Sequence, residues 1–247
     1  MARKALTDTL WDQLQSTMIK YGCYQTQNSR EIMEAILWKL RTGAPWRDIP
    51  EELCSWKTAY SRFNRWSKTG LWADFFWLLS RSYGMGIHRR KLCSLSSACK
   101  WSSAWRRAIG QSRGGATTKI HLSCDADGYP LQFKITGGDV HDSQIAGELI
   151  EMIGQADYFI ADKGYDSECI RDKARSHNMI PVIPKRKNAK QPNPEFDSYL
   201  YKLRHLVENM FARLKHFRSI ATRYEKLARN FKSMLYLACT IVHCKMN

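Results

Sequence analysis

The sequence predicts a helical amino-terminal domain followed by a mixed-sheet domain of the α+β or α/β class. Apolar residues recur at helical spacing within residues 1–82, and β-branched or apolar runs alternate with helical spacing within residues 108–247. Residues 83–107 fit neither pattern, so we expect an irregular linker there. The predicted domains are therefore residues 1–82 and residues 108–247.

The composition indicates a protein that acts on a polyanion. The 247 residues include 39 lysines and arginines against 23 acidic residues, a formal net charge of +16. Such a surface attracts nucleic acid or an anionic membrane. There is no lysine-rich amphipathic helix and no apolar run of about 18 residues, so a membrane role is disfavoured. Residues 1–10 lack the apolar core of a secretory signal, and we expect a cytoplasmic protein.

The eight cysteines are scattered without a Cys-x-x-Cys pair, which is typical of reduced cytosolic thiols rather than of a zinc ribbon. Cys239, His243 and Cys244 could reach one metal ion from a single helix. A hydrophobic carboxy-terminal helix explains the same residues more simply, and we prefer that interpretation.

Three helices are predicted in the amino-terminal domain. The first begins at Asn28, which has capping-box spacing with Glu31, and it stops at Gly43. The second and third are expected over residues 55–68 and 71–82, and a glycine separates them.

The second helix combines an apolar stripe with a basic remainder. Lys57, Arg62 and Arg65 lie largely off the stripe. The stripe itself contains Trp56, Ala59, Tyr60, Phe63 and Trp66. Short helices with tight turns and one basic face are what a helix-turn-helix reader of the major groove needs. A small helical bundle with solvated charges would show the same pattern, so both interpretations stay open at this point.

The carboxy-terminal half carries the signals of a mixed sheet. Residues 117–124 and 131–136 are expected to form a hairpin about the turn at Asp125. A helix is expected over residues 143–153, and Tyr158–Ala161 reads as a short buried strand.

Two acidic residues are the candidate catalytic and metal-binding groups. Asp162 follows a strand at once, and Glu208 lies on a long helix expected to begin near Tyr199, after a strand over residues 179–183. One carboxylate at the end of a strand and another on a helix late in the sequence suit a two-metal phosphoryl-transfer site, because hard Mg²⁺ prefers oxygen ligands. Plainer roles also exist: Asp162 as a helix cap, and Glu208 as an exposed partner of Arg204.

The surroundings of Glu208 resemble the signature of DDE transposases from bacterial insertion sequences. Four residues have the spacing Tyr-x2-Arg-x3-Glu-x6-Lys, namely Tyr201, Arg204, Glu208 and Lys215. On one continuous helix the last three share a face, and Tyr201 extends it. The stretches that begin at Ile160 and at Arg41 are similar to the same family, so the resemblance covers nearly the whole chain.

This resemblance implies a ribonuclease H-like catalytic domain. It implies that Asp162 and Glu208 bind Mg²⁺ or Mn²⁺, with two ions in an intact site. The metal would activate water, which nicks the 3′ ends of the element. The freed 3′-OH then attacks target DNA. Tyr201, Arg204 and Lys215 would contact or order the terminal nucleotides.

The family resemblance also implies a helix-turn-helix-like head that binds DNA, with Lys57, Arg62 and Arg65 as its candidate contacts. The expected partners are the terminal inverted repeats, the target DNA and further copies of this chain in the DNA complex. The expected location is the bacterial cytoplasm, at the nucleoid.

One acidic residue of the family pattern is missing. The family has its first catalytic aspartate on the first strand, upstream of the stretch that is 110–115 here, yet residues 83–107 contain no acidic residue. We therefore expect the first strand to be lost. Back-translation of residues 83–91, read one nucleotide later, permits Met-Glu-Trp-Val-Phe-Ile-Asp-Gly-Ser. We hypothesise that residues 83–107 are translated out of frame, which the coding DNA would test.

No nearby acid is expected to replace the missing one. Asp125 and Asp127 belong to the expected hairpin turn, and Asp142 is expected to cap a helix. With only Asp162 and Glu208, a metal site would lose a bridging ligand and most of its activity. Two alternatives stay open: an inactive transposase copy that only binds DNA, and a ribonuclease H-like nuclease unrelated to transposition.

Overall fold

The computed structural model describes residues 4–23, 26–82, 92–101, 108, 110–112, 115–154, 156–186, 189, 192–194 and 196–246. The chain forms two compact units. The helical unit comprises Met1–Tyr83 and Leu214–Asn247, and the sheet unit comprises Gly84–Arg213. This division differs from the predicted one because the carboxy-terminal helix α10 (Ala228–Met246) packs on α4 (Leu71–Ser82).

The helical unit contains the three predicted helices. They are α2 (Ser29–Thr42), α3 (Trp56–Thr69) and α4, joined by the short 3-10 helix η1 (Trp46–Asp48), and α9 (Arg218–Ala221) belongs to the same unit. Helix α1 (Asp8–Lys20) was not predicted. Asn28 is the N-cap of α2, but its side chain makes no capping hydrogen bond, so the predicted capping box is not formed.

Aromatic side chains fill the core of this unit. The rings of Phe63 and Trp72 lie 5.5 Å apart, and Trp72 meets Phe75 edge to face at 5.7 Å. The ring centres of Tyr236, on α10, and Phe76 lie 5.8 Å apart, so the last helix completes the core. Tyr60 was expected in the apolar stripe of α3, but its side chain is 37% exposed.

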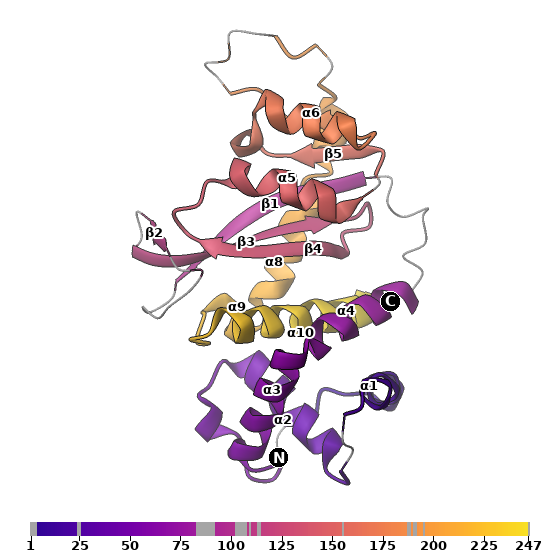
Figure 1. The fold of residues 1–247 in the computed structure, drawn as a ribbon, viewed down its shortest axis with the longest axis vertical. Coiled ribbons are helices and arrows are strands. Elements are labelled where there is room, and N and C mark those ends of the chain that lie inside the picture. The colour runs from indigo at the N-terminus through magenta and orange to yellow at the C-terminus, as the bar shows by residue number, and fades with distance from the viewer. Residues whose placement is uncertain are drawn as a thin grey trace. The chain divides into compact units, whose positions relative to one another are not determined.

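The sheet unit is a mixed sheet with the strand order β2-β3-β1-β5-β6, and β4 also pairs with β3. The strands are β1 (Leu92–Trp101), β2 (Gly110–Ser112), β3 (Gly115–Cys124), β4 (Pro130–Gly137), β5 (Tyr158–Ala161) and β6 (Ile180–Val182). Strand β3 is antiparallel to β1 and β4, whereas β5 is parallel to β1 and β6. This topology is ribonuclease H-like, as expected, and Figure 1 shows α5 and α6 beside the sheet.

The prediction that the first strand is lost was wrong. Leu92–Trp101 forms β1 at the centre of the sheet, where Leu92 pairs with Tyr158 and Leu95 with both Ala161 and Ser123. A central strand is hydrogen-bonded on both edges and covered on both faces, so it needs no polar-apolar alternation. Residues 83–91 and 102–107 lie outside the described residues, and the frame hypothesis is untested there.

Strand β5 separates two cores. Phe159 and Ala161 pack against α5 (Asp142–Ile153) and α6 (Glu168–Ser176), whereas Ile160 packs with Leu200 of α7 (Ser198–Lys202). Successive strand residues point to opposite faces, which explains this division. Covered faces on both sides fit the continuous apolar run of Tyr158–Ala161.

The long helix expected from Tyr199 is interrupted. Helix α7 ends at Lys202, Leu203 and Arg204 form a turn, and α8 spans His205–Lys215. Tyr201 and Glu208 therefore lie on different helices.

Gly43 provides a test of how α2 ends. It adopts the left-handed φ of +69°, and an added Cβ would lie 3.0 Å from both Arg218 Cβ and Tyr224 Cε2. Gly70, at φ +85°, would meet nothing within 4 Å. We expect Gly43→Ala to lower the free energy of unfolding by about 2 kcal/mol and Gly70→Ala by about 1 kcal/mol. Urea unfolding of both variants measures this, and equal losses would show that the contacts with Arg218 and Tyr224 are unimportant.

Candidate catalytic site

Asp162 lies where β5 ends at the carboxyl edge of the parallel strands. It is the N-cap of the 3-10 helix η3 (Lys163–Tyr165), and its Oδ1 accepts a hydrogen bond from the Gly164 N–H at 2.7 Å. Asp162 is half-buried, whereas Lys163 is exposed. Asp162 thus has the capping role that the sequence analysis considered for it, and this hydrogen bond holds the carboxylate at the edge of the sheet.

Asp142 lies beside Asp162, although the two are far apart in sequence. A Cβ built on Gly164 would stand 2.8 Å from Asp162 Oδ1 and 3.6 Å from Asp142 Oδ2, so both carboxylates border the space above this glycine. Asp142 was expected to cap α5, but the N-cap is His141, whose side chain accepts a hydrogen bond from the Ser143 N–H. The carboxylate of Asp142 ion-pairs with Lys119, with Asp142 Oδ1 3.0 Å from Lys119 Nζ.

His121 underlies this acidic corner. It is fully buried on β3, its Nε2 lies 2.9 Å from Thr136 Oγ1, and its Nδ1 lies 3.9 Å from Asp142 Oδ1. Burial lowers the pKa of His121 to about 4; Asp142 opposes this shift, and the charges of Lys119 and Lys134 add to it. His121 is therefore neutral at pH 7, although it lies close to a carboxylate.

The four residues of the Tyr-Arg-Glu-Lys pattern are only partly brought together. Arg204 Nη2 pairs with Glu208 Oε1 at 2.9 Å, and the Arg204 guanidinium lies 5.7 Å from the centre of the Tyr201 ring. Glu208 is exposed in the first turn of α8, where the positive end of the helix dipole favours a carboxylate. Lys215, also exposed, is the last residue of α8.

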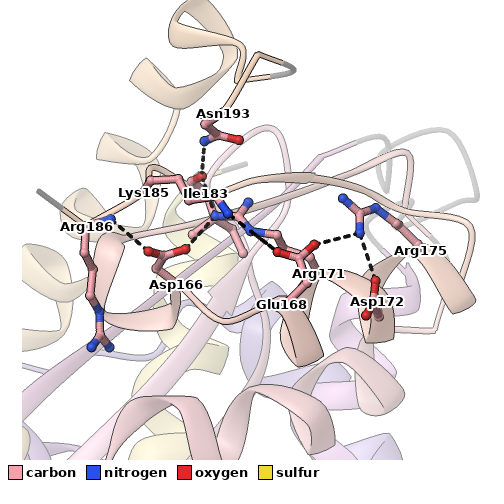
Figure 2. Close-up of polar contacts among 9 residues, drawn as sticks. All are labelled: Asp166, Glu168, Arg171, Asp172, Arg175, Ile183, Lys185, Arg186 and Asn193. Atoms are coloured by element: carbon pink, nitrogen blue, oxygen red, sulfur yellow. Dashed lines mark hydrogen bonds and ion pairs between the residues drawn. The ribbon is translucent and has the colours of Figure 1, made fainter. Parts of the chain in front are cut away.

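An ionic network that the sequence analysis missed fixes the segment after Asp162. The buried guanidinium of Arg171 donates to Asp166 Oδ1 at 2.8 Å and to the Ile183 carbonyl at 3.0 Å. The other oxygen of Asp166 accepts from the Arg186 N–H at 2.8 Å, and Asn193 donates to the same Ile183 carbonyl, as Figure 2 shows. Burial alone would raise the pKa of Asp166, but these hydrogen bonds lower it below its usual value. The loop after β6 is thereby tied to the turn that holds Asp162.

Carboxylate oxygens are the ligands that Mg²⁺ and Mn²⁺ prefer. The carboxylates of Asp162 and Asp142, which border the space at Gly164, therefore have the right chemistry for a hard cation. Across the described residues, no group of three or more His, Cys, Asp or Glu side chains is placed to hold one ion. Strand β1 contributes no carboxylate, and its Ser94 has a buried hydroxyl that makes no hydrogen bond. The described residues thus bring two carboxylates, those of Asp162 and Asp142, to the space at Gly164.

The carboxy-terminal cysteines fit the apolar-helix interpretation. Cys239 is fully buried in α10, and burial raises the pKa of its thiol. A thiol that keeps its proton is a poor metal ligand.

The basic face of α3 is accessible. Lys57 and Arg65 are exposed and Arg62 is half-buried, whereas Ala59, Phe63 and Trp66 are buried beneath them. Within the described part of the chain, none of the helices has the length and apolar character that crossing a bilayer requires.

Two family models match the chain, and together they span most of it. Residues 6–76 match "Putative transposase of IS4/5 family", and residues 91–242 match "Transposase DDE domain". The second match alone covers more than half of the 247 residues.

Individual relatives carry similar names. The chain is 35% identical over 130 residues to "Putative transposase for insertion sequence element IS6501" of Brucella ovis, across 51% of this chain and 97% of that protein. It is 34% identical over 136 residues to "Putative transposase for insertion sequence element IS402" of Burkholderia cepacia, across 51% of this chain and only 62% of that protein. A solved structure, "Crystal structure of the Mos1 mariner paired end complex with Mn", aligns over 97% of this chain and 88% of its own, at 13% identity and a TM-score of 0.29.

The buried His121 predicts a pH dependence of stability. Because its folded pKa of about 4 lies below the ordinary histidine value of 6.5, its contribution to stability is complete above pH 6.5 and declines as the pH falls toward 4. We expect this loss to reach about 3 kcal/mol, and His121→Gln to abolish it because glutamine does not titrate. Urea unfolding at pH 7.5, 5.5 and 4.5 measures it. The exposed His205→Gln should behave as wild type, and a wild-type slope in His121→Gln would contradict the assignment.

Proposed function

Because this chain belongs to the transposase DDE-domain family, we propose that it binds the ends of a bacterial insertion element and directs metal-dependent cleavage and transfer of DNA strands. The observation that carries the proposal is the position of Asp162, which caps a turn at the carboxyl edge of a ribonuclease H-like sheet. The Tyr-x2-Arg-x3-Glu-x6-Lys pattern follows in the chain at α7 and α8.

In this proposal Asp162 and Glu208 hold Mg²⁺ or Mn²⁺, two ions in an intact site. The bound metal would polarise phosphate oxygens and activate water or a 3′-OH for in-line attack. Asp142 is added to the candidate ligands because it borders the same space as Asp162. Glu208 is now paired with Arg204, so metal binding requires Arg204 to exchange the carboxylate for another anion, such as a phosphate.

The cations around Glu208 suit the ends of a DNA strand. Arg204 offers a planar guanidinium for a phosphate and lies over the Tyr201 ring, so both residues can order a terminal nucleotide. Lys215 lies seven residues, or about two helical turns, after Glu208, and would meet a neighbouring phosphate.

The helical unit is proposed to read the terminal inverted repeats. Lys57, Arg62 and Arg65 on α3 would contact the DNA, and the net charge of +16 would draw the duplex to the protein. Joining two element ends and a target requires more than one protomer, so we propose a homo-oligomer in the DNA complex. These activities belong to the bacterial cytoplasm, at the nucleoid.

One observation favours a second candidate, a copy that binds element ends without cutting them. Residues 83–107 contain no acid, so no residue of this segment, β1 included, can supply the family's first aspartate. A labelled element end incubated with Mn²⁺ distinguishes the two: the active copy nicks it, and the inactive copy only shifts its mobility.

The role of Glu208 predicts a separation of cleavage from binding. Glu208→Gln should reduce nicking of a labelled element end at least about 100-fold, because the amide removes the charge that holds the cation. Binding through the helical unit should remain within about twofold in a mobility-shift assay. Glu151→Gln is the matched control, since Glu151 is also exposed and ion-paired, to Lys173. Unchanged nicking by Glu208→Gln in a chain that nicks would refute this role.

A further inference from the structure

The helical unit contains a pocket that the proposed function does not use. Its volume is about 780 Å³, and it lies between the segment after α2 and the turn that precedes α10. Trp46, Trp56, Tyr60 and Tyr224 contribute to its lining. A pocket of this size with aromatic walls and a few polar groups is typical of a ligand site.

The aromatic walls are held in place yet accessible. Trp46 and Tyr60 meet edge to face, with ring centres 5.4 Å apart. The ring centre of the buried Phe63 lies 5.2 Å from that of Trp46. Tyr224, at 57% exposure, is among the most exposed large hydrophobic side chains of the described residues. Such rings offer flat faces on which a planar group can stack.

A buried polar cluster forms the floor. Lys39 Nζ lies 3.7 Å from Glu225 Oε1, which also accepts a hydrogen bond from Trp46 Nε1 at 3.0 Å. Lys39 Nζ stands 5.8 Å from the Trp46 ring centre and 5.6 Å from that of Tyr224. Burial lowers the pKa of Lys39, although Glu225 opposes the shift. This cluster fixes the indole of Trp46 in the wall of the pocket.

One lining residue has an unused hydrogen-bonding atom. Asn230 is 2% exposed, it lines the pocket, and its Oδ1 is buried without a hydrogen-bond partner. A buried acceptor without a donor costs about 1 to 3 kcal/mol, so such an atom marks a place where a ligand N–H would bind.

The rim of the pocket is positive. Arg47 and Lys226 are exposed lining residues, and the Arg47 guanidinium lies 5.6 Å from the Trp56 ring centre. Stacking rings, an amide acceptor and cations at the mouth are the elements that bind one nucleotide of a single strand: the base enters and its phosphate meets the cations.

We propose that this pocket binds an unpaired nucleobase of a DNA strand held by the helical unit. The base stacks on the aromatic walls and donates an N–H to Asn230 Oδ1, while its phosphate lies near Arg47 and Lys226. The inference rests on the proposed function for the DNA itself, and it adds recognition of an unpaired nucleotide by residues of the helical unit.

The test uses the full-length chain and two 12-nucleotide single strands. One is abasic at every position, and the other carries a single central adenine in the same abasic backbone, so both have the same phosphates. We expect the adenine strand to bind about tenfold more tightly, in line with the stacking of one base. Equal affinity for the two strands would overturn the proposal, because only phosphate contacts would then remain.

Three variants locate the base. Tyr224→Ala removes an exposed ring and Asn230→Leu removes the acceptor, and both should abolish the preference without changing affinity for the abasic strand. Tyr21→Ala is the control, because Tyr21 is 53% exposed in the same unit and does not line the pocket. A preference that survives in Tyr224→Ala overturns the proposal, and unchanged affinity for the abasic strand shows that this variant is folded. Binding of an element-end duplex is measured in parallel, and its loss in Lys57→Ala/Arg65→Ala tests the DNA-binding role of the helical unit. Intact duplex binding without a preference for the adenine strand rejects only the proposal that the pocket binds a base.

Discussion

The pairing of β1 with β5 determines where the acidic chemistry of this chain lies. Leu92 to Leu95 run parallel to Tyr158–Ala161, so the chain leaves β5 at the carboxyl edge of the central strands. Asp162 is the first residue beyond that edge, and its bond to the Gly164 N–H turns the chain toward α6. Without this pairing, the turn at Asp162 would not be held at this edge of the sheet.

Burial and ion pairs set the charges of the titratable side chains at the same edge. Asp142 ion-pairs with Lys119, and His121 stays neutral because burial outweighs its attraction to that carboxylate. Behind the turn, Arg171 neutralises Asp166 and ties the loop after β6 to it. The carboxylates proposed to bind a cation are thus Asp162 and Asp142 at this edge and Glu208 on α8, whose partner Arg204 is itself partly exposed.

Local signals were sufficient for much of the fold. The glycines after α2 and α3 and the apolar run before Asp162 predicted those elements closely, because caps and periodicity act within a few residues. Strand β1 could not be predicted in this way, since its two neighbours, distant in sequence, define it. The turn at Leu203, the approach of Asp142 to Asp162, and the contacts of Arg171 likewise come from tertiary packing. The aromatic pocket joins residues near 46 to residues near 225, a separation that no sequence periodicity reveals.

The central claim is that the edge beyond β5 holds a divalent cation through Asp162. Titration of the full chain with Mn²⁺, followed by the electron paramagnetic resonance signal of the free ion, tests it directly. We predict that Asp162→Asn weakens Mn²⁺ binding at least about tenfold, while Asp172→Asn, which changes an exposed aspartate of α6, leaves binding unchanged. Equal Mn²⁺ affinity in wild type and Asp162→Asn would contradict the assignment of this edge as the metal site.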